Sequence, residues 1–349
     1  MKAAVLYGKE DLRFEDVPMP QTGRGEVLVQ VRATGICGSD IPRVLGEGAH
    51  HYPVILGHEF CGTVAETGEG VTRVKPGDRV AGVPLLPCMI CEDCLRGDYA
   101  LCRHYSFIGS RVQGGFAEYV CLPEKNVVKF DDSIPFTQGA FFEPASVAFH
   151  GLMRVDYQGG GDVAVLGAGT IGIFTLQWAR IFGARRVAVF DIDPDRLKLA
   201  EKYGADFTVN SLEEGFQEKV QQITGGKGFQ YVYETAGAEA AMKSVFEIAG
   251  SKARVCLVGT PVREITCTPR LLENIHRKEF LLTGSWMSYS APFPGREWHL
   301  TAHYFNTGQL KFDESLIYLK LPLERIGEGF AQYRTPGQVK GKILVIQEA

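Results

Sequence analysis

The sequence predicts a two-domain α/β protein, in which a β-rich domain accompanies a doubly wound parallel sheet. Length is the first reason, since 349 residues with 45% hydrophobic and 22% charged side chains can form a large core and exceed the usual size of one domain. The second reason is a change of pattern near residue 150. Short alternating strands precede this point, and repeated strand-then-helix units follow it.

The β-rich domain is expected over residues 1–150. Apolar and polar residues alternate there as in half-buried strands, at residues 27–33, 60–66 and 117–122. A cysteine-dense loop from residue 87 to about residue 104 interrupts this pattern. After residue 285 the pattern is irregular, and its last strand candidate is KILVIQ. We therefore expect residues 286–349 to return to the first domain.

Residues 151–285 carry the strand-then-helix units. The apolar strand candidates DVAVLG, RVAVFDID and YVYETAG are each followed by a stretch of helical character, and ARVCLVGT and FLLTGSW add two further strands. This alternation predicts a parallel sheet with helices on both faces. A doubly wound domain is therefore expected over 151–285.

Charge and hydropathy exclude several classes of partner. The 37 Lys and Arg residues against 41 Asp and Glu give a net charge of -4, which offers no basic surface for nucleic acid. The only long apolar stretch, residues 163–179, contains glycine, threonine and glutamine, and suits a strand, a turn and a buried helix better than a membrane span. The start lacks the apolar core of a secretory signal, so we expect a cytoplasmic protein with no membrane partner.

The motif GAGTIG follows the strand DVAVLG and opens a helical pattern, which is the setting of a dinucleotide-binding turn. Gly167 permits the tight turn, Gly169 lets a pyrophosphate approach the backbone, and Gly172 lets the helix pack on the sheet. Thr170 and Ile171 complete the turn at the helix N-terminus. The alternative is an ordinary glycine-rich turn that binds nothing.

The residues after this motif favour NAD over NADP. Asp191 ends the next strand candidate, where a carboxylate can hydrogen-bond the adenosine ribose and repel a 2′-phosphate. Arg185 and Arg186 precede that strand, so we expect them at the far end of the sheet. Arg196 falls in the first turns of the following helix and could cover the adenine side.

Cys88, Cys91, Cys94 and Cys102 have the spacing C-x2-C-x2-C-x7-C, which is typical of a structural zinc site. Closely spaced thiolates on one loop can surround a zinc ion in tetrahedral geometry. Two disulfides or an iron–sulfur cluster are the alternatives. A closed site of this kind stabilises its lobe and takes no part in catalysis.

A second, dispersed set comprises Cys37, His58, Glu59 and Glu143. Each residue alone is a weak signal, but together they supply thiolate, imidazole and carboxylate, the mixed set of a catalytic zinc with one open position. His50 and His51 could line the entrance to such a site. The remaining cysteines are expected to be core residues: Cys61, Cys121, Cys256 and Cys267.

Five segments in this order resemble the zinc-dependent medium-chain alcohol dehydrogenases, within their polyol dehydrogenase branch: GICGSD, LGHEFCGTV, the four-cysteine loop, GAGTIG and EPASVAFHG. The resemblance covers the whole chain. It implies a GroES-like β-rich catalytic domain and a Rossmann NAD-binding domain with a doubly wound parallel sheet. It also implies two zinc ions per subunit, one catalytic and one structural, and a homodimer or homotetramer.

The same resemblance implies roles for individual residues. Cys37, His58 and Glu143 match catalytic zinc positions, with Glu59 as a ligand or an exchanging neighbour, and Ser39 matches the hydroxyl that begins a proton relay. Pro42 departs from the family, because several members carry a relay histidine nearby. The stretches that border the nicotinamide and the cofactor phosphates match Val258, Gly259, Thr260, Ser285, Trp286 and Lys342.

The function that follows is NAD⁺-linked oxidation of a secondary alcohol of a sugar alcohol phosphate to a ketose phosphate. The phosphorylated substrate is what the resemblance of four stretches to one part of this family implies: AHHYPVILGHEF, VPLLPCMICEDC, FIGSRVQGGFAEY and GSWMSYSAPFPGREW. An unphosphorylated polyol dehydrogenase of the sorbitol or L-iditol type is the second reading, a threonine dehydrogenase the third, and a noncatalytic NAD-binding redox sensor the alternative outside enzymes. Candidates for phosphate contact are Arg43, Arg111, Lys278 and Arg296.

Overall fold

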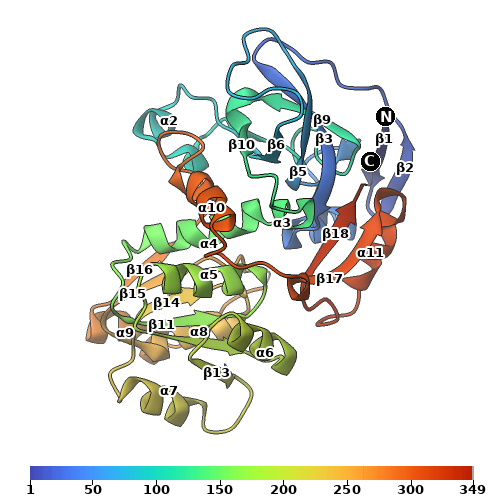
Figure 1. The fold of residues 1–349 in the computed structure, drawn as a ribbon. Coiled ribbons are helices and arrows are strands. Elements are labelled where there is room, and N and C mark those ends of the chain that lie inside the picture. Colours follow the sequence, from blue (N-terminus) through green and yellow to red (C-terminus); the bar gives the residue numbers. More distant parts are fainter. Residues whose placement is uncertain (262, 348–349) are drawn as a thin grey trace. The chain divides into compact units, whose positions relative to one another are not determined.

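The computed structural model describes residues 1–261 and 263–347. Within it the chain forms two compact units. Unit 1 comprises Met1–Glu143, Tyr289–Gly308 and the chain from Phe312 onward, and unit 2 comprises Pro144–Ser288 and Gln309–Lys311. Each unit has its own sheets, coloured along the chain in Figure 1.

Unit 1 is built on a seven-stranded sheet with the order β10-β6-β5-β3-β18-β17, in which β9 also pairs with β3. Alternating valines on the inner side of β3 are fully buried, which is why this segment forms a central strand. A three-stranded sheet, β2-β1-β4, and the pair β7-β8 complete the unit. The strands are β1 (Lys2–Gly8), β2 (Asp11–Asp16), β3 (Glu26–Gly35), β4 (Val54–Ile55), β5 (Glu59–Thr67), β6 (Arg79–Gly82), β7 (Leu85–Leu86), β8 (Ser106–Phe107), β9 (Tyr119–Pro123), β10 (Val127–Lys129), β17 (Ile317–Pro322) and β18 (Lys342–Ile346).

The end of the chain is part of the same sheet as its beginning. Strand β18 pairs antiparallel with β3, with Leu344 opposite Gly35, and parallel with β17. Unit 1 also carries short helices that connect its strands. These are α1 (Ile41–Val44), α2 (Glu92–Arg96), α3 (Phe136–Gly139), α10 (Arg296–Asn306) and α11 (Ile326–Gln332), with the 3-10 turns η1 (Gly38–Asp40), η2 (Tyr99–Leu101), η3 (Glu124–Asn126), η4 (Glu314–Leu316) and η5 (Leu323–Arg325).

Unit 2 is a six-stranded sheet in the order β13-β12-β11-β14-β15-β16, and all its strands run parallel. This is the strand order of a doubly wound dinucleotide-binding fold, which confirms the predicted fold class. Its central strands are apolar and buried along their length, as parallel strands covered on both faces require. The strands are β11 (Asp162–Leu166), β12 (Arg186–Asp191), β13 (Phe207–Asn210), β14 (Phe229–Glu234), β15 (Ala249–Leu257) and β16 (Leu281–Gly284).

Helices connect successive strands of unit 2 and pack against the sheet (Figure 1). Helix α6 shows why these segments start where they do, since Asp193 accepts hydrogen bonds from the amides of Asp195 and Arg196 and Pro194 occupies the first helical position. The helices are α4 (Phe142–Arg154), which begins in unit 1, α5 (Thr170–Ile181), α6 (Pro194–Lys202), α7 (Phe216–Thr224), α8 (Glu239–Ile248) and α9 (Pro269–Lys278).

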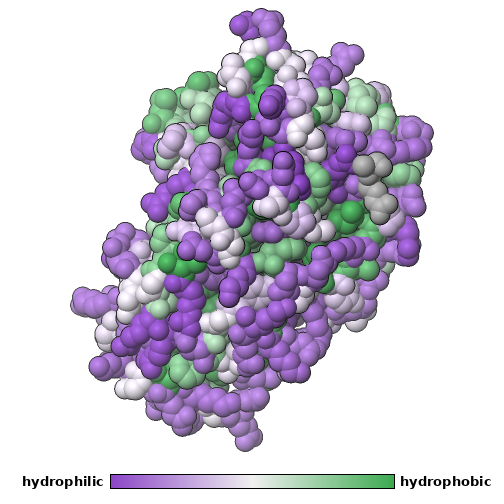
Figure 2. All heavy atoms as spheres, in the orientation of Figure 1, coloured by the Kyte–Doolittle hydropathy of each residue, from purple (hydrophilic) through white to green (hydrophobic). Residues whose placement is uncertain are grey.

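The apolar stretch 163–179 forms strand β11, a glycine turn and helix α5, as its composition predicts. Among the residues that the structure describes, no helix combines the length and apolar character that a membrane crossing requires. On the face shown in Figure 2, hydrophilic side chains predominate and apolar ones form small scattered patches.

Several elements have no counterpart in the pattern seen in the sequence, among them β13, α7, α9 and α10. Strand β13 and helix α7 lie between the second and third predicted units, and helix α10 lies in the tail described there as irregular. The strand is short and mixed in character, FTVN, and α10 follows a proline-rich segment, so neither has a clear periodic signal.

Candidate metal and cofactor sites

The structure brings Cys37, His58 and Glu59 together in unit 1, with their ligand atoms all within 4.8 Å of one another. Strand pairing accounts for the meeting. Strand β3 ends at Gly35 and strand β5 begins at Glu59, and these two residues are directly opposite each other in the antiparallel register. Cys37 follows β3 as the cap of η1, so its thiol lies beside the start of β5.

Asp40 organises this cluster, although the sequence patterns did not single it out. Its side chain is fully buried, accepts a hydrogen bond from the Cys37 amide at 3.1 Å, and lies 3.5 Å from His58 Nδ1. Burial by itself would lower the pKa of His58, but the charges of Asp40 and Cys37 outweigh it and raise that pKa well above its usual range. A buried imidazole beside a carboxylate has a fixed orientation, as metal-binding histidines generally do.

Glu59 meets the ammonium group of Lys342, which comes from β18 at the other end of the chain. Lys342 Nζ donates to Glu59 Oε1 at 2.8 Å, lies 2.6 Å from Oε2 and also donates to the Ile36 carbonyl. Burial opposes the charged form of Lys342, yet Glu59 and Cys37 raise its pKa. In this structure the Lys342 charge is buried and bound to Glu59, and its approach to the cofactor phosphates stays a prediction.

Glu143 lies near the cluster without joining it. It occupies the first turn of α4, and its ligand oxygens fall outside the group formed by Cys37, His58 and Glu59. Burial, followed by the negative charge of Glu59, raises the pKa of Glu143 to about 7. The carboxylates of Glu143 and Glu59 thus lie near the same positive charges, those of His58 and Lys342. In this geometry Glu59 is the one grouped with Cys37 and His58.

Ser39 is exposed beside the cluster. Its hydroxyl donates to Cys37 Sγ at 3.4 Å, and Arg43 Nη1 donates to both Ser39 Oγ at 2.9 Å and the Ser39 carbonyl at 2.5 Å. Pro42 lies in the first turn of α1, where it cannot offer a titratable group. A hydroxyl that can exchange protons with solvent therefore adjoins the thiol.

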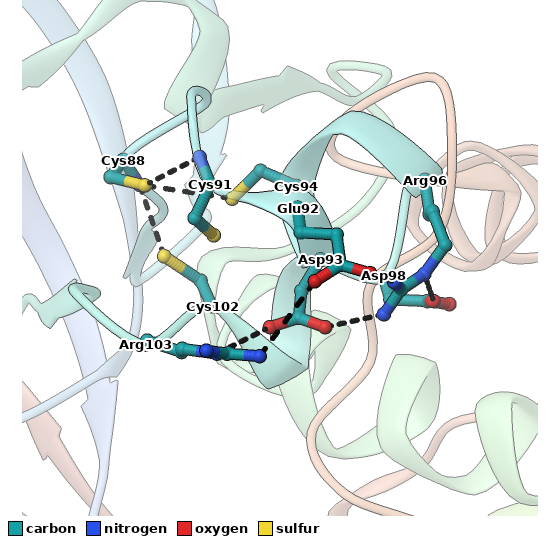
Figure 3. A network of polar contacts seen from close by, with 9 residues as sticks. All are labelled: Cys88, Cys91, Glu92, Asp93, Cys94, Arg96, Asp98, Cys102 and Arg103. Atoms are coloured by element: carbon teal, nitrogen blue, oxygen red, sulfur yellow. Dashed lines mark hydrogen bonds and ion pairs between the residues drawn. The ribbon is translucent and has the colours of Figure 1, made fainter.

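The four-cysteine cluster is a separate site on the loop around α2. Figure 3 shows the thiols of Cys88, Cys91, Cys94 and Cys102 turned toward one another, with the acidic and arginine side chains of the loop to one side. Cys88 Sγ and Cys94 Sγ are 4.0 Å apart. Four sulfurs bound tetrahedrally to zinc would lie about 3.8 Å apart, so the set fits this ion.

Backbone amides prepare these sulfurs for the thiolate form. The Cys88 amide donates to Cys102 Sγ at 3.3 Å and the Cys91 amide donates to Cys88 Sγ at 3.4 Å. A hydrogen bond from the Cys94 backbone is the main cause that lowers the pKa of Cys91 to about 6, whereas burial raises the pKa of Cys94 to about 12. The loop thus favours the thiolate form at Cys91 but not at Cys94. A bound cation would be needed to stabilise the thiolate of Cys94.

The remaining cysteines are only partly core residues. Cys61 and Cys256 are fully buried, as expected. Cys121 and Cys267 are instead half-buried, because they lie on the outer side of a strand and in a connecting loop. For Cys121 the prediction was wrong, whereas Cys267, although only partly buried, packs against the core of unit 2.

The cofactor residues predicted in unit 2 gather at one edge of its sheet. Parallel strands end at the same edge, and the GAGTIG turn follows β11, Asp191 ends β12, and the two other stretches follow β15 and β16. This is the edge at which doubly wound folds bind dinucleotides. The set brought there is Gly167, Gly169, Thr170, Ile171, Gly172, Asp191, Val258, Gly259, Thr260, Ser285 and Trp286.

Two glycines of the turn are required by its geometry. Gly167 has a φ of 100°, and a side chain at Gly172 would approach the Gly167 carbonyl oxygen to 1.8 Å. No atom lies within 4 Å of the position that a side chain at Gly169 would occupy, so the backbone there is open to a ligand. Thr170 and Ile171 begin α5, whose first amides have no partner within the helix.

Asp191 is held by backbone amides at this edge. Its carboxylate accepts from Ala168 in the glycine turn at 2.7 Å and from the amide of Ile192 at 2.8 Å. Arg185 and Arg186 lie at the opposite ends of the strands, where both bind the buried Asp162. Their predicted position away from the nucleotide edge is confirmed.

Glu234 joins the loops of this edge and was missed by the sequence reasoning. It is fully buried, its Oε1 accepts from the amides of Ala236 and Gly237 at 2.8 and 2.9 Å, and its carbonyl accepts from Val258 and Gly259. Burial raises the pKa of Glu234 to about 7, even though both amide bonds lower it.

The other cofactor residues occupy more varied surroundings. Ser285 is tied to β15 through its amide, Trp286 is half-exposed, and Arg196 lies in the first turn of α6.

The fit of zinc to the mixed cluster follows from its donors. Cys37, His58 and Glu59 offer sulfur, nitrogen and oxygen, which zinc accepts in three-ligand catalytic sites. His58 Nδ1 lies 3.5 Å from the buried Asp40 carboxylate, an acidic neighbour that orients the ring as in metal-binding histidines. The residues present therefore suit the metal.

Unit 2 has the strand order and the glycine turn of a dinucleotide-binding fold, and the β-rich unit 1 carries two clusters of metal-binding residues. Together these features define the class of metal-dependent dehydrogenases. Family models agree with this class: residues 23–132 match "Alcohol dehydrogenase GroES-like domain" and residues 170–302 match "Zinc-binding dehydrogenase". The chain belongs to the zinc-binding medium-chain alcohol dehydrogenases.

Among individual relatives, galactitol 1-phosphate 5-dehydrogenase of Escherichia coli K12 is 40% identical over 347 residues, which cover 99% of this chain and 100% of that enzyme. The crystal structure of the Escherichia coli enzyme matches with a TM-score of 0.94 and 38% identity, covering 99% of this chain and 100% of that one. These comparisons confirm the resemblance to this enzyme over the whole chain.

Relatives with other names are also similar. Sorbitol dehydrogenase of Bacillus subtilis is 36% identical over 266 residues, covering 75% of each chain. A structure described as a zinc-binding dehydrogenase from Sinorhizobium meliloti 1021 bound to NADP has a TM-score of 0.89 and 31% identity, and covers 99% of both chains. Family membership therefore leaves the substrate and the choice of nicotinamide cofactor to be argued separately.

Proposed function

We propose that this protein oxidises a secondary alcohol of a sugar alcohol phosphate, with NAD⁺ as the hydride acceptor. The observation that carries the proposal is the Ser39 hydroxyl, 3.4 Å from Cys37 Sγ at the edge of a thiolate, imidazole and carboxylate set. A structural metal site has no need of an exposed hydroxyl at its rim. A catalytic one needs a group that takes the alcohol proton.

Bound zinc would lower the pKa of an alcohol, and bound NAD⁺ would accept the hydride from its carbon. The chain's own residues supply position and proton transfer. Ser39 Oγ takes the proton of the substrate hydroxyl as it releases its own proton to solvent, and Arg43 holds this hydroxyl in place through its bond to Oγ. Because Ser39 is exposed, the transfer to water requires no histidine at Pro42.

Around the proposed ligands, Asp40 fixes the His58 ring and Lys342 balances the charge of Glu59. Since Lys342 contacts both oxygens of Glu59, we propose that Glu59 is a ligand that can be released to its lysine. Glu143, whose pKa is raised to about 7, would take its place or hydrogen-bond a substrate hydroxyl in its protonated form. The four-cysteine cluster would hold a second zinc ion with a structural role.

In unit 2 we propose that the GAGTIG turn binds the pyrophosphate and that Asp191 binds the ribose. A carboxylate at this point disfavours a 2′-phosphate, which supports NAD over NADP. Val258, Gly259, Thr260, Ser285 and Trp286 would border the nicotinamide, with Arg196 near the adenine. We further propose a cytoplasmic homodimer or homotetramer.

The phosphorylated substrate is supported by similarity over the whole chain, at 40% identity, to an enzyme named for galactitol 1-phosphate. Sorbitol dehydrogenase covers only 75% of the chain at 36% identity, so an unphosphorylated polyol is the second candidate.

The test is NADH formation by the purified, zinc-loaded protein with galactitol 1-phosphate, galactitol, sorbitol, L-iditol and threonine, repeated with NADP⁺. We expect a kcat/KM for the phosphorylated polyol that exceeds every other by at least about tenfold, since a charged group adds contacts worth 1.4 kcal/mol or more. Preference for a free polyol would retain the chemistry and remove the phosphate from the proposal. No turnover on the whole panel, with zinc and NAD⁺ bound, would favour a redox sensor.

A further inference from the structure

We propose that Arg43, His50 and Arg111 form the binding subsite for the phosphate group of the substrate. The inference rests on the proposed function and adds to it the residues that recognise the anion. All three side chains belong to unit 1, and they come from three segments that the fold joins around the cluster of Cys37, His58 and Glu59.

Helix α1 and the loop after it bring Arg43 and His50 to one place. The Gly48 amide donates to the Pro42 carbonyl at 2.9 Å, so the chain turns back over α1 before it reaches His50. A side chain at Gly48 would lie 3.3 Å from the Arg43 amide, which shows how closely this loop packs on the helix.

A second contact connects this loop to the segment that carries Arg111. His51 Nε2 lies in hydrogen-bond contact with the Arg111 carbonyl at 3.1 Å. The Arg111 guanidinium lies over the Tyr105 ring, 4.6 Å from its centroid, and contacts its hydroxyl at 3.4 Å. Stacking on one face leaves the edge of a guanidinium, where its N–H groups point, available to an anion.

Short chains of contacts connect the segments of Arg43 and Arg111 with the proposed reaction centre. On one side, Arg43 donates to Ser39 Oγ, and Ser39 donates to Cys37 Sγ. On the other side, the ring of Phe107 packs edge-on against His58, with 5.6 Å between centroids, and the chain runs from Phe107 to Arg111. Arg43 thus adjoins the cluster through Ser39, and the Arg111 amide donates to the Phe107 carbonyl at 2.9 Å, in the turn that follows this ring.

Cationic side chains predominate at this place. Burial, followed by the positive charges of Arg111, Arg43 and His51, lowers the pKa of His50. Asp40 is the exception, but it is fully buried behind Arg43, 3.6 Å from Nη1, and faces His58. The exposed Glu47 lies in the same loop, and among residues 1–261 and 263–347 no ion pair joins a carboxylate to His50 or Arg111.

Donor capacity remains on Arg43. Its Nη1 is occupied by Ser39, whereas within the part of the chain that the structure describes its Nη2 makes no hydrogen bond. A phosphate dianion suits such a site, because a planar guanidinium can donate two parallel hydrogen bonds to phosphate oxygens. A neutral polyol carries no negative charge that would offset the repulsion between these cationic side chains.

Lys278, another cationic candidate, does not share this position. It lies in unit 2 at the end of α9, where its ammonium donates to the Phe246 and Glu247 carbonyls. That contact caps the last turn of α8 and engages the lysine.

The experiment compares Arg111→Gln and His50→Gln with the wild-type holoenzyme on galactitol 1-phosphate and on galactitol. We expect Arg111→Gln to lower the ratio of the two kcat/KM values about tenfold to a hundredfold, through a higher KM for the phosphorylated polyol, because one charge-assisted pair is lost. Arg111→Lys should recover part of this ratio. Arg325→Gln is the matched control, since Arg325 is an exposed arginine of unit 1 that pairs with Glu328, and it should leave the ratio unchanged.

Inorganic phosphate provides an independent readout. It should inhibit galactitol oxidation by the wild type competitively, and its inhibition constant should rise at least about tenfold in Arg111→Gln. If the wild type prefers galactitol 1-phosphate but both glutamine variants keep the wild-type ratio and inhibition constant, the subsite is overturned while the proposed function stands. If the wild type shows no preference for the phosphorylated polyol, both fail.

Discussion

The two side-chain clusters of unit 1 differ in how they are assembled. The four-cysteine cluster comes from one loop, with ligands between Cys88 and Cys102, and its nearest partners are the amides of that loop. The mixed cluster comes from the end of β3 and the start of β5, and buried charges from η1 and β18 hold its residues.

This difference corresponds to a difference in chemistry. Four sulfurs satisfy a tetrahedral ion completely and leave no position for a substrate. Three unlike donors leave a position open, and the exposed Ser39 hydroxyl lies beside it. A local loop is sufficient for a closed site, whereas an open site requires rigid surroundings that keep charge balanced when water or substrate exchanges.

The largest expected effect belongs to the open cluster. Cys37→Ser should lower kcat/KM by more than about a thousandfold, because it removes a thiolate from the proposed reaction centre. Far-UV circular dichroism should remain that of the wild type. Near-normal turnover by the purified variant would contradict the assignment of Cys37.

Lys342→Met tests whether the open cluster depends on charges brought from elsewhere in the chain. It leaves the buried Glu59 carboxylate without its cation, which typically costs about 3–5 kcal/mol of unfolding free energy. Denaturant unfolding of the variant and the wild type measures this difference. Lys342→Arg retains the charge and should lose less, while a loss below about 1 kcal/mol in Lys342→Met would show that the pair is unimportant.

Cys94→Ser tests the closed cluster in the opposite sense. We expect the melting temperature to fall by about 5–10 °C, because a structural metal contributes its binding free energy to folding. The turnover of the folded fraction at 25 °C should remain within about twofold of the wild type. Loss of turnover comparable to that of Cys37→Ser would remove the distinction between the two clusters.

Asp162 of unit 2 provides a reference for a buried charge outside the two clusters. Its carboxylate accepts hydrogen bonds from the side chains of Arg185 and Arg186. Burial opposes its ionisation, but the hydrogen bonds from Arg186 and Arg185 outweigh burial and lower the pKa of Asp162 to about 2. Because the folded pKa is depressed, its stabilisation is present above pH 4 and is lost as the pH falls toward 2. This loss should amount to about 2 kcal/mol.

The measurement for Asp162 is unfolding free energy against pH for the wild type and Asp162→Asn. The variant should lack this part of the acid-dependent loss, and the zinc content of both clusters should be unchanged. Equal pH profiles of the unfolding free energy for the two proteins would contradict the lowered pKa of Asp162.

The sequence was informative where a site is local. The cysteine loop and the GAGTIG turn could be recognised because their spacing is set by a single loop or turn, and the strand before that turn and Asp191 lie close by in the chain. The position of Arg185 and Arg186 also followed from chain order, since residues before a parallel strand lie at its amino end.

It was less informative where distant segments meet. The partner of Glu59 is Lys342, 283 residues away, and only the pairing of β18 with β3 brings it there. Asp40 and Glu234 were missed too, because each also contacts a segment distant in the chain, His58 for Asp40 and the loop after β15 for Glu234. Lys278 was a plausible phosphate contact by charge alone, but the fold uses it to cap a helix.

The most direct test of the account is the zinc content of the wild type, Cys37→Ser and Cys94→Ser, measured with turnover and melting temperature on the same samples. The account predicts two zinc ions per chain in the wild type and one in each variant, with turnover lost only in Cys37→Ser and melting temperature lowered mainly in Cys94→Ser. A wild type with a single zinc ion, or two variants with the same loss of activity and stability, would contradict two sites with separate roles.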